Sequence, residues 1–246
     1  MNLALMHNYS TTGVVLHTLK YGDNALIVFL LTADRGRTSC IVRGIKGRHG
    51  GNRMALLQPM FVVEIEAVSS SRAQMDTIRD VRSAVPLVSV PFDIVKSTIA
   101  MFMAEVLYRL VRDVEPNSLL FDFVCGAVQS LDDAAEGVAN FHLKFLVELS
   151  RYMGFYPSGD YREGDLLDIR EGVFVGALPL HGDAMSADNT RILAAVMSEE
   201  FDTLSRISLN RTARDGFLSA MLDYFGYHLD TIHTIRSVEI LRTVFG

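Results

Sequence analysis

The chain is poor in residues and motifs that would indicate a cofactor or a membrane. Its 246 residues include two cysteines and no tryptophan. Cys40 and Cys125 lie far apart with no CxxC pair, which favours buried thiols over a disulfide or a zinc site. Because a structural zinc site needs four ligands, we expect no metal and no other cofactor. No apolar run approaches the ~18 residues of a membrane span, so we expect no membrane partner.

The usual signatures of catalysis are missing as well. The chain has no GxSxG elbow, no GxxxxGK[ST] phosphate loop, no GxGxxG after a strand and no HExxH. Since catalysis needs convergent groups, we expect a protein that is not an enzyme. The N-terminus lacks the basic region and the apolar run of a signal peptide, so we expect it to be cytoplasmic.

Positive charge is concentrated in one part of a chain whose net charge is −6. Residues 1–82 hold ten Lys/Arg and six Asp/Glu, a balance of +4, whereas residues 83–246 hold thirteen and twenty-three, a balance of −10. Such segregation indicates a nucleic-acid-binding face on an acidic body. The most basic stretch is residues 35–53, and its cations are Arg35, Arg37, Arg43, Lys46, Arg48 and Arg53.

This stretch runs from an alternating strand into a glycine-rich loop. No acidic residue occurs between Asp34 and Glu64. Because lysine and arginine are almost never buried unpaired, the pattern predicts a surface that binds an anion. The alternative interpretation is a solvated hairpin whose charges only keep the protein soluble.

The N-terminal third has the pattern of five short strands, predicted at residues 12–21, 25–34, 37–45, 58–68 and 72–81. The residues expected on their inward face are Val14, Leu16, Thr18, Cys40, Val42, Val63, Ile65 and Ala67. Closure into a ring would remove exposed strand edges, so we predict a small closed or partly closed barrel. An SH3-like barrel would fit this pattern of five short strands nearly as well.

After Pro86 and Pro91 the hydrophobic period changes to that of helices. Helices are predicted at residues 93–114, 118–133, 137–154, 189–199, 210–229 and 235–245. Gly154 is expected to cap its helix. The sequence of residues 158–188 predicts loops around one weak pair of strands. The fold class is therefore α+β, with a barrel domain at residues 1–82 and an all-helical domain at 83–246.

Four blocks of sequence together resemble the RecO family of bacterial recombination mediators: residues 13–47, 56–68, 100–111 and 142–157. Members of that family resemble an OB-fold barrel followed by a helical domain. The resemblance implies that the protein binds single- and double-stranded DNA and anneals complementary strands at the nucleoid. It also implies that the protein works with RecR and helps to load RecA onto DNA coated by single-stranded-DNA-binding protein.

The resemblance assigns DNA binding to the six cations of residues 35–53. It also implies that the helical domain receives the acidic, apolar-tipped tail of single-stranded-DNA-binding protein. The arginines available for that contact are Arg109, Arg112, Arg151 and Arg214. The chain departs from many relatives because residues 158–188 lack their four-cysteine zinc module. Two other functions stay open, an adaptor that binds proteins without binding DNA and a hydrolase with an unrecognised site.

Overall fold

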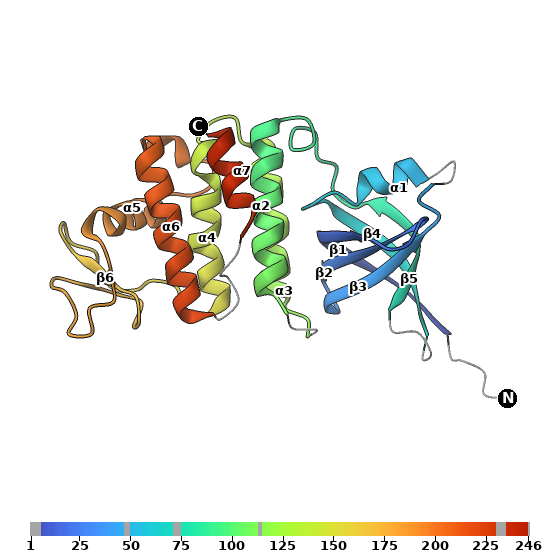
Figure 1. Ribbon diagram of the computed structural model, residues 1–246, viewed down its shortest axis with the longest axis horizontal. Coiled ribbons are helices and arrows are strands. Elements are labelled where there is room, and N and C mark those ends of the chain that lie inside the picture. Colours follow the sequence, from blue (N-terminus) through green and yellow to red (C-terminus); the bar gives the residue numbers. More distant parts are fainter. Residues whose placement is uncertain (1–5, 47–49, 71–74, 113–114, 230–234, 246) are drawn as a thin grey trace. The chain divides into compact units, whose positions relative to one another are not determined.

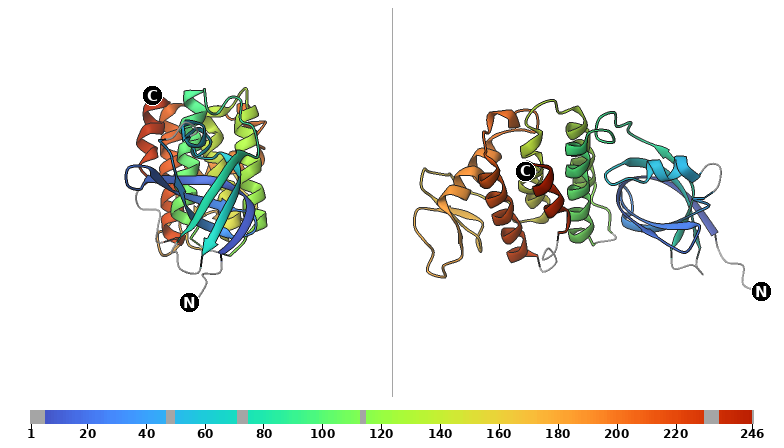
Figure 2. Two further views of the ribbon diagram at one scale, coloured as in Figure 1. Left: turned by 90° about the vertical axis from the view of Figure 1, so that its right-hand side faces the viewer. Right: turned by 45° about the horizontal axis from the view of Figure 1, so that its top comes forward.

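The computed structural model describes residues 6–46, 50–70, 75–112, 115–229 and 235–245. Five strands near the N-terminus close into a barrel in the order β1-β2-β3-β5-β4 (Figure 1). They are β1 (Met6–Lys20), β2 (Ala25–Thr32), β3 (Gly36–Arg43), β4 (Val62–Ser70) and β5 (Asp76–Ser83). Neighbouring strands are antiparallel except β3 and β5, which run parallel. Figure 2 shows these strands wrapping around a common interior, so the predicted five-stranded OB-fold-like barrel is confirmed.

Apolar side chains from all five strands fill the barrel. On β4, Val63, Ile65 and Ala67 are buried while the alternate residues Glu64 and Glu66 are exposed, as predicted. The interior cluster consists of Val15, Val28, Leu30, Cys40, Val42, Leu57, Val63, Ile65, Ala67, Ile78 and Val81. Burial raises the pKa of the Cys40 thiol to about 11, so this thiol is an inert core group.

The inward face predicted for the first strand was wrong. Val15, expected to point outward, belongs to the interior cluster. The register of β1 against β2 shifts between Val15 and His17. An irregularity of this kind changes which side chains face inward. Val14 and Leu16 are buried too, so burial does not alternate here.

A short helix, α1 (Gly50–Leu56), lies between β3 and β4. Leu56 and the adjacent Leu57 pack against the interior cluster of the barrel. The end of the segment predicted to be a glycine-rich loop is therefore helical, because its apolar residues dock on the barrel. Arg53 lies on this helix and not on a loop.

The six predicted helices are all present: α2 (Ile94–Leu110), α3 (Ser118–Asp133), α4 (Phe141–Met153), α5 (Ala187–Ser198), α6 (Arg211–His228) and α7 (Ser237–Val244). Two short 3-10 helices, η1 (Val138–Asn140) and η2 (Leu204–Arg206), accompany them. Helices α4, α5 and α6 pack on one another (Figure 1). As predicted, Gly154 caps α4 in the left-handed region, at a φ of 89°. Among the described helices, none combines the length and apolarity that a bilayer crossing requires.

Residues 158–188 contain a small sheet in the order β7-β6-β8. Its strands are β6 (Leu166–Asp168), β7 (Val173–Val175) and β8 (Ala184–Met185), so the predicted strand pair is present with a third strand added. Six apolar residues lie on or beside β6 and β7, and of these only Leu167 is fully buried: Leu166, Leu167, Ile169, Val173, Phe174 and Val175.

Polar contacts also hold residues 158–188 together. Nε2 of His181 lies 3.1 Å from Oδ2 of Asp168, and the backbone N–H of Asp183 donates to Nδ1 of the same ring. Arg170 Nε donates to the Asp183 carboxylate at 2.7 Å. Within the part of the chain that the structure describes, no group of three or more His, Cys, Asp or Glu residues is suited to a metal ion.

The chain divides into two compact units. One comprises Met1–Val88 with Met103–Gln129, and the other Ser89–Phe102 with Ser130–Gly246. The division passes through α2 and near the end of α3. The boundary between residues 82 and 83 stays a prediction.

Candidate nucleic-acid interface

The end of β3 presents two of the cations singled out in the sequence. Arg43 is the last residue of the strand and is exposed, and Lys46 is exposed in the turn that follows. Asn24 fixes this turn, because its carbonyl accepts from Gly44 N–H and its side-chain oxygen accepts from Lys46 N–H, each at 2.9 Å. Gly44 has a φ of 78°, which favours glycine. Arg48 lies outside the described residues.

Arg53 connects the end of β3 with β5. Its Nη2 donates to the carbonyl of Arg79 at 3.0 Å, and its Nη1 lies 3.5 Å from the carbonyl of Arg43. Both acceptors are neutral, so the guanidinium keeps its positive charge uncompensated. Helix α1 therefore carries a cation to the place where two strands meet.

Arg79 is a fourth cation at this place, and sequence reasoning missed it. The parallel pairing of β3 and β5 brings Val42 opposite Ile78, and the next residues on the two strands are Arg43 and Arg79, both exposed. No local pattern around Arg79 marks it, since the neighbouring TIRD reads only as part of a strand. Only the pairing of two strands distant in sequence reveals this neighbourhood.

We call Arg43, Lys46, Arg53 and Arg79 the cationic surface. Among the described residues, no carboxylate lies within ion-pairing distance of any of them. By contrast, Arg82 on the same strand β5 pairs with Asp80 at 2.9 Å and with Glu66 at 3.6 Å. Like charges held together without counter-charges raise the local concentration of anions. The arrangement suits a polyanion such as a phosphate backbone.

The Arg37 side chain contacts the end of α2 and is not part of the cationic surface. Its Nη1 donates to the carbonyls of Tyr108 and Val111, at 2.9 and 2.8 Å, at the end of α2. The guanidinium also lies over the Tyr108 ring, 4.5 Å from its centre. Burial lowers the pKa of Arg37 below its usual value. These bonds satisfy carbonyls at the C-terminal end of α2, which gives Arg37 a structural role.

Arg35 is likewise engaged within the first unit. Its guanidinium lies 3.7 Å from the centre of the Tyr9 ring, and its Nε is buried without a hydrogen-bond partner among the described residues. The Tyr9 hydroxyl donates to Asp76 at 2.7 Å. Burial and this bond raise the pKa of Tyr9 above its usual value. The structure therefore separates Arg35 and Arg37 from Arg43, Lys46 and Arg53.

Aromatic side chains contribute little to the cationic surface. Phe29 and Phe61 pack inside the first unit, Phe29 against Tyr108 and Phe61 against the barrel cluster. Tyr21 is exposed, but it lies in the turn between β1 and β2. The cationic surface thus offers charge in place of a stacking platform.

Comparisons with known proteins agree with this architecture. Residues 6–86 match the family model "Recombination protein O N terminal", and residues 91–237 match "Recombination protein O C terminal". The chain belongs to the RecO family. DNA repair protein RecO of Phocaeicola vulgatus is 34% identical over 237 residues, which cover 96% of this chain and 98% of that protein. The protein of the same name from Flavobacterium psychrophilum is 31% identical, with the same coverage of each chain. Membership indicates a role in DNA repair and recombination.

The four arginines proposed to contact a partner of this RecO-family protein fall into the two units. Arg109 and Arg112 belong to the first unit and Arg151 and Arg214 to the second. Arg109 pairs with Glu105 at 3.6 Å. Arg214 is half-buried, donates to Asn140 and to the carbonyl of Leu209, and lies over the Phe245 ring. The exposed members are therefore Arg112 and Arg151.

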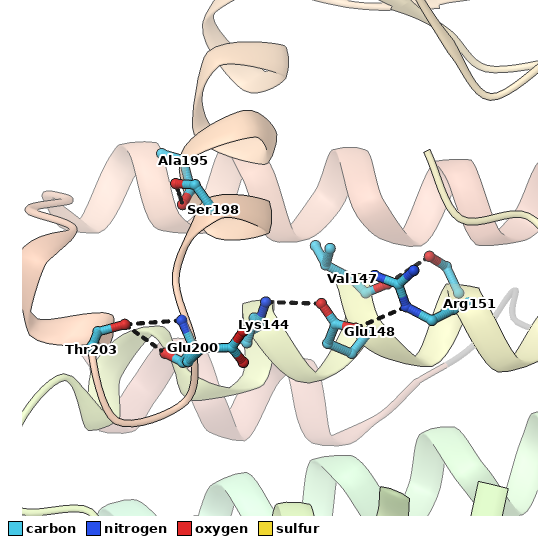
Figure 3. A network of polar contacts seen from close by, with 9 residues as sticks. Lys144, Val147, Glu148, Arg151, Ala195, Ser198, Glu200 and Thr203 are labelled. Atoms are coloured by element: carbon cyan, nitrogen blue, oxygen red, sulfur yellow. Dashed lines mark hydrogen bonds and ion pairs between the residues drawn. The ribbon is translucent and has the colours of Figure 1, made fainter. Parts of the chain in front are cut away.

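Arg151 is part of a polar network on α4. Glu148 accepts from Lys144 at 2.8 Å and from Arg151 at 3.2 Å, as Figure 3 shows. The Lys144 side chain is only 3% exposed, whereas that of Arg151 is 52% exposed. The Arg151 guanidinium also lies over the Tyr156 ring. A cation beside an aromatic ring offers a small site of mixed charged and apolar character.

Proposed function

We propose that this RecO-family protein binds single- and double-stranded DNA through the cationic surface of its barrel. The observation that carries this proposal is the convergence of Arg43, Lys46, Arg53 and Arg79 from β3, α1 and β5 without a carboxylate partner among the described residues. Arg48, between Lys46 and Arg53 in the sequence, is proposed to join them. Arg35 and Arg37 support the fold.

Contacts of this kind recognise phosphates and not bases. Phosphate contacts fix the position of a protein on DNA without reading its sequence, so binding is expected to be weakly sequence-specific and strongly salt-dependent. Glycine at position 44 lets the backbone come close to a strand. Annealing follows from the same chemistry, because a surface that screens two phosphate backbones lowers the repulsion between complementary strands. This step needs no nucleotide hydrolysis and no enzyme activity.

The wider role is that of a recombination mediator acting in the cytoplasm, at the nucleoid. We propose that the protein works with RecR and helps RecA to load onto DNA coated by single-stranded-DNA-binding protein. The acidic, apolar-tipped tail of that protein is proposed to bind the helical region at Arg151 and Tyr156, where a cation and a ring lie together. An Arg151→Ala variant that bound a tail peptide as tightly as the wild type would exclude this contact.

A salt titration of oligonucleotide binding tests the DNA-binding proposal. If the four cations each neutralise a phosphate on a single strand, the slope of log K against log salt should be about −3. The double variant Arg43→Ala/Lys46→Ala should flatten that slope by about 1.4 and weaken binding to unrelated sequences alike. Its stability should stay within about 0.5 kcal/mol of the wild type, because both residues are exposed.

The matched control removes two exposed arginines from the helical region. Arg191 and Arg206 are 59% and 70% exposed and have carboxylates at 4.0 and 3.5 Å. The variant Arg191→Ala/Arg206→Ala should keep the wild-type slope. If neither double variant changed the affinity for DNA or its salt dependence, the cationic surface would not bind DNA and would only be exposed to solvent. A protein that captured its partners and bound no DNA would be an adaptor.

A further inference from the structure

A hollow of ≈ 620 Å³ lies on the barrel beside the cationic surface. Its walls come from the start of β1, the end of β4 and the middle of β5: Met6, Asn8, Tyr9, Ser10, Glu66, Ala67, Val68 and Arg79. This volume falls within the ~300–1,000 Å³ of small-ligand sites. The hollow is not on the face of strands 2 and 3 on which OB folds usually bind oligonucleotides.

Arg79 links the hollow to the cationic surface. In the pairing of β4 with β5, Glu66 lies opposite Asp80 and Ala67 opposite Ile78, which leaves Arg79 as the extra residue of a bulge. Bulges redirect a side chain and are frequent next to functional sites. Arg53 Nη2 donates to the Arg79 carbonyl, so the Arg53 guanidinium is held against the backbone of Arg79. A phosphate bound by these arginines would lie at the rim of the hollow.

The other walls offer the chemistry that a nucleobase requires. Asn8 and Ser10 are exposed, and their side chains make no hydrogen bond to other described residues. An amide and a hydroxyl supply the donors and acceptors that match a base edge. Met6 and Val68 supply apolar surface for the face of a base. Tyr9 is fixed by Arg35 above its ring and by Asp76 at its hydroxyl, so this wall is pre-organised.

The charge of Glu66 orients the ligand. Glu66 lines the hollow, and its carboxylate pairs with Arg82 at 3.6 Å. A carboxylate repels a phosphate but accepts from the exocyclic amine of a base. The phosphate therefore belongs at the Arg79 side and the base edge at the Glu66 side.

We propose that the hollow takes one unpaired nucleobase from a single strand whose backbone follows the cationic surface. The inference rests on the proposed DNA binding and adds a site that separates single from double strands. A base inside a duplex has its pairing edge occupied and its faces stacked, so it cannot enter. Phosphate contacts serve both forms of DNA, and the hollow serves single strands alone.

Two variants of the walls test this site, with binding measured to single- and double-stranded oligonucleotides at one salt concentration. Asn8→Ala/Ser10→Ala should weaken single-strand binding about fivefold to tenfold, a loss of the size expected for one base contact, and leave duplex binding unchanged. Ser10→Trp should do the same by filling the hollow. A 2-aminopurine in the single strand should brighten when the wild type binds and lose that response in both variants.

Arg191→Ala is the control for the arginine. Arg191 is exposed on α5, belongs to the second unit and does not line the hollow. Arg79→Ala should weaken single-strand binding and flatten its salt slope by about 0.7, whereas Arg191→Ala should change neither. Folded Asn8→Ala/Ser10→Ala and Ser10→Trp proteins that kept wild-type single-strand affinity would overturn the hollow alone. A wild type that bound neither oligonucleotide would overturn DNA binding itself.

Discussion

The cationic surface of the barrel and the helical region hold positive charge in different ways. On the barrel, Arg43, Lys46 and Arg53 have no carboxylate partner among the described residues. In the helical region, Lys144 and Arg151 share Glu148, Arg170 pairs with Asp183, and Arg206 pairs with Glu199. The comparison teaches that net charge alone does not locate a binding surface. What matters is which cations the fold leaves without a counter-charge.

The largest expected effect comes from the buried ion pair of α4. Glu148→Ala leaves the Lys144 ammonium buried without its partner, and this should lower the free energy of unfolding by about 3 kcal/mol. Chemical denaturation measures the loss. The double variant Lys144→Met/Glu148→Ala should recover most of it, because no buried charge remains. Equal stability of the Glu148→Ala variant and the wild type would show that this pair is not structural.

Arg37 sharpens the comparison, because this barrel cation is half-buried and donates to backbone carbonyls of its own unit. Arg37→Ala removes two charge-assisted bonds to the carbonyls of Tyr108 and Val111 and should destabilise the protein by about 2 kcal/mol. Arg43→Ala, on the same strand but exposed, should cost less than about 0.5 kcal/mol. Thermal and urea unfolding of the two variants measure these losses in stability. Similar losses in both would break the distinction between inward and outward cations.

His142 makes the helical region sensitive to acid. Complete burial, assisted by the nearby Arg214, lowers the pKa of this ring to about 3. The unfolded chain binds the proton near the ordinary value of ~6.5, so the stabilisation is complete above that pH and is lost as the pH falls. At pH 5.5 the loss should be about 1.4 kcal/mol. His142→Leu should remove this share of the pH dependence, and an unchanged profile in the variant would contradict the assignment.

The smallest effect concerns residues 158–188. His181→Ala removes the contacts with Asp168 and Asp183 and should cost about 1 kcal/mol or speed proteolytic cleavage of this segment. A chelator should leave the melting temperature unchanged, since only two cysteines occur in the chain. Elemental analysis showing one zinc per chain would refute the expectation that the segment is zinc-free.

Much of the fold followed from local pattern. The alternation around Val63 predicted β4, and three- and four-residue periodicity predicted α3 at its observed bounds, because hydrophobic period reports which side of an element is buried. The register irregularity at Val15 and the helix α1 escaped prediction, since both depend on how strands and apolar side chains meet across the barrel.

The candidate site divides in the same way. The sequence by itself determined that positive charge gathers in residues 35–53, because charge is a property of composition. Only the tertiary structure decided that Arg35 and Arg37 turn inward and that Arg79 joins Arg43 and Arg53. Those outcomes depend on partners far away in the chain: Tyr9, the carbonyls at the end of α2, and the parallel pairing of β3 with β5. No local pattern records such contacts, since they exist only after the barrel has closed.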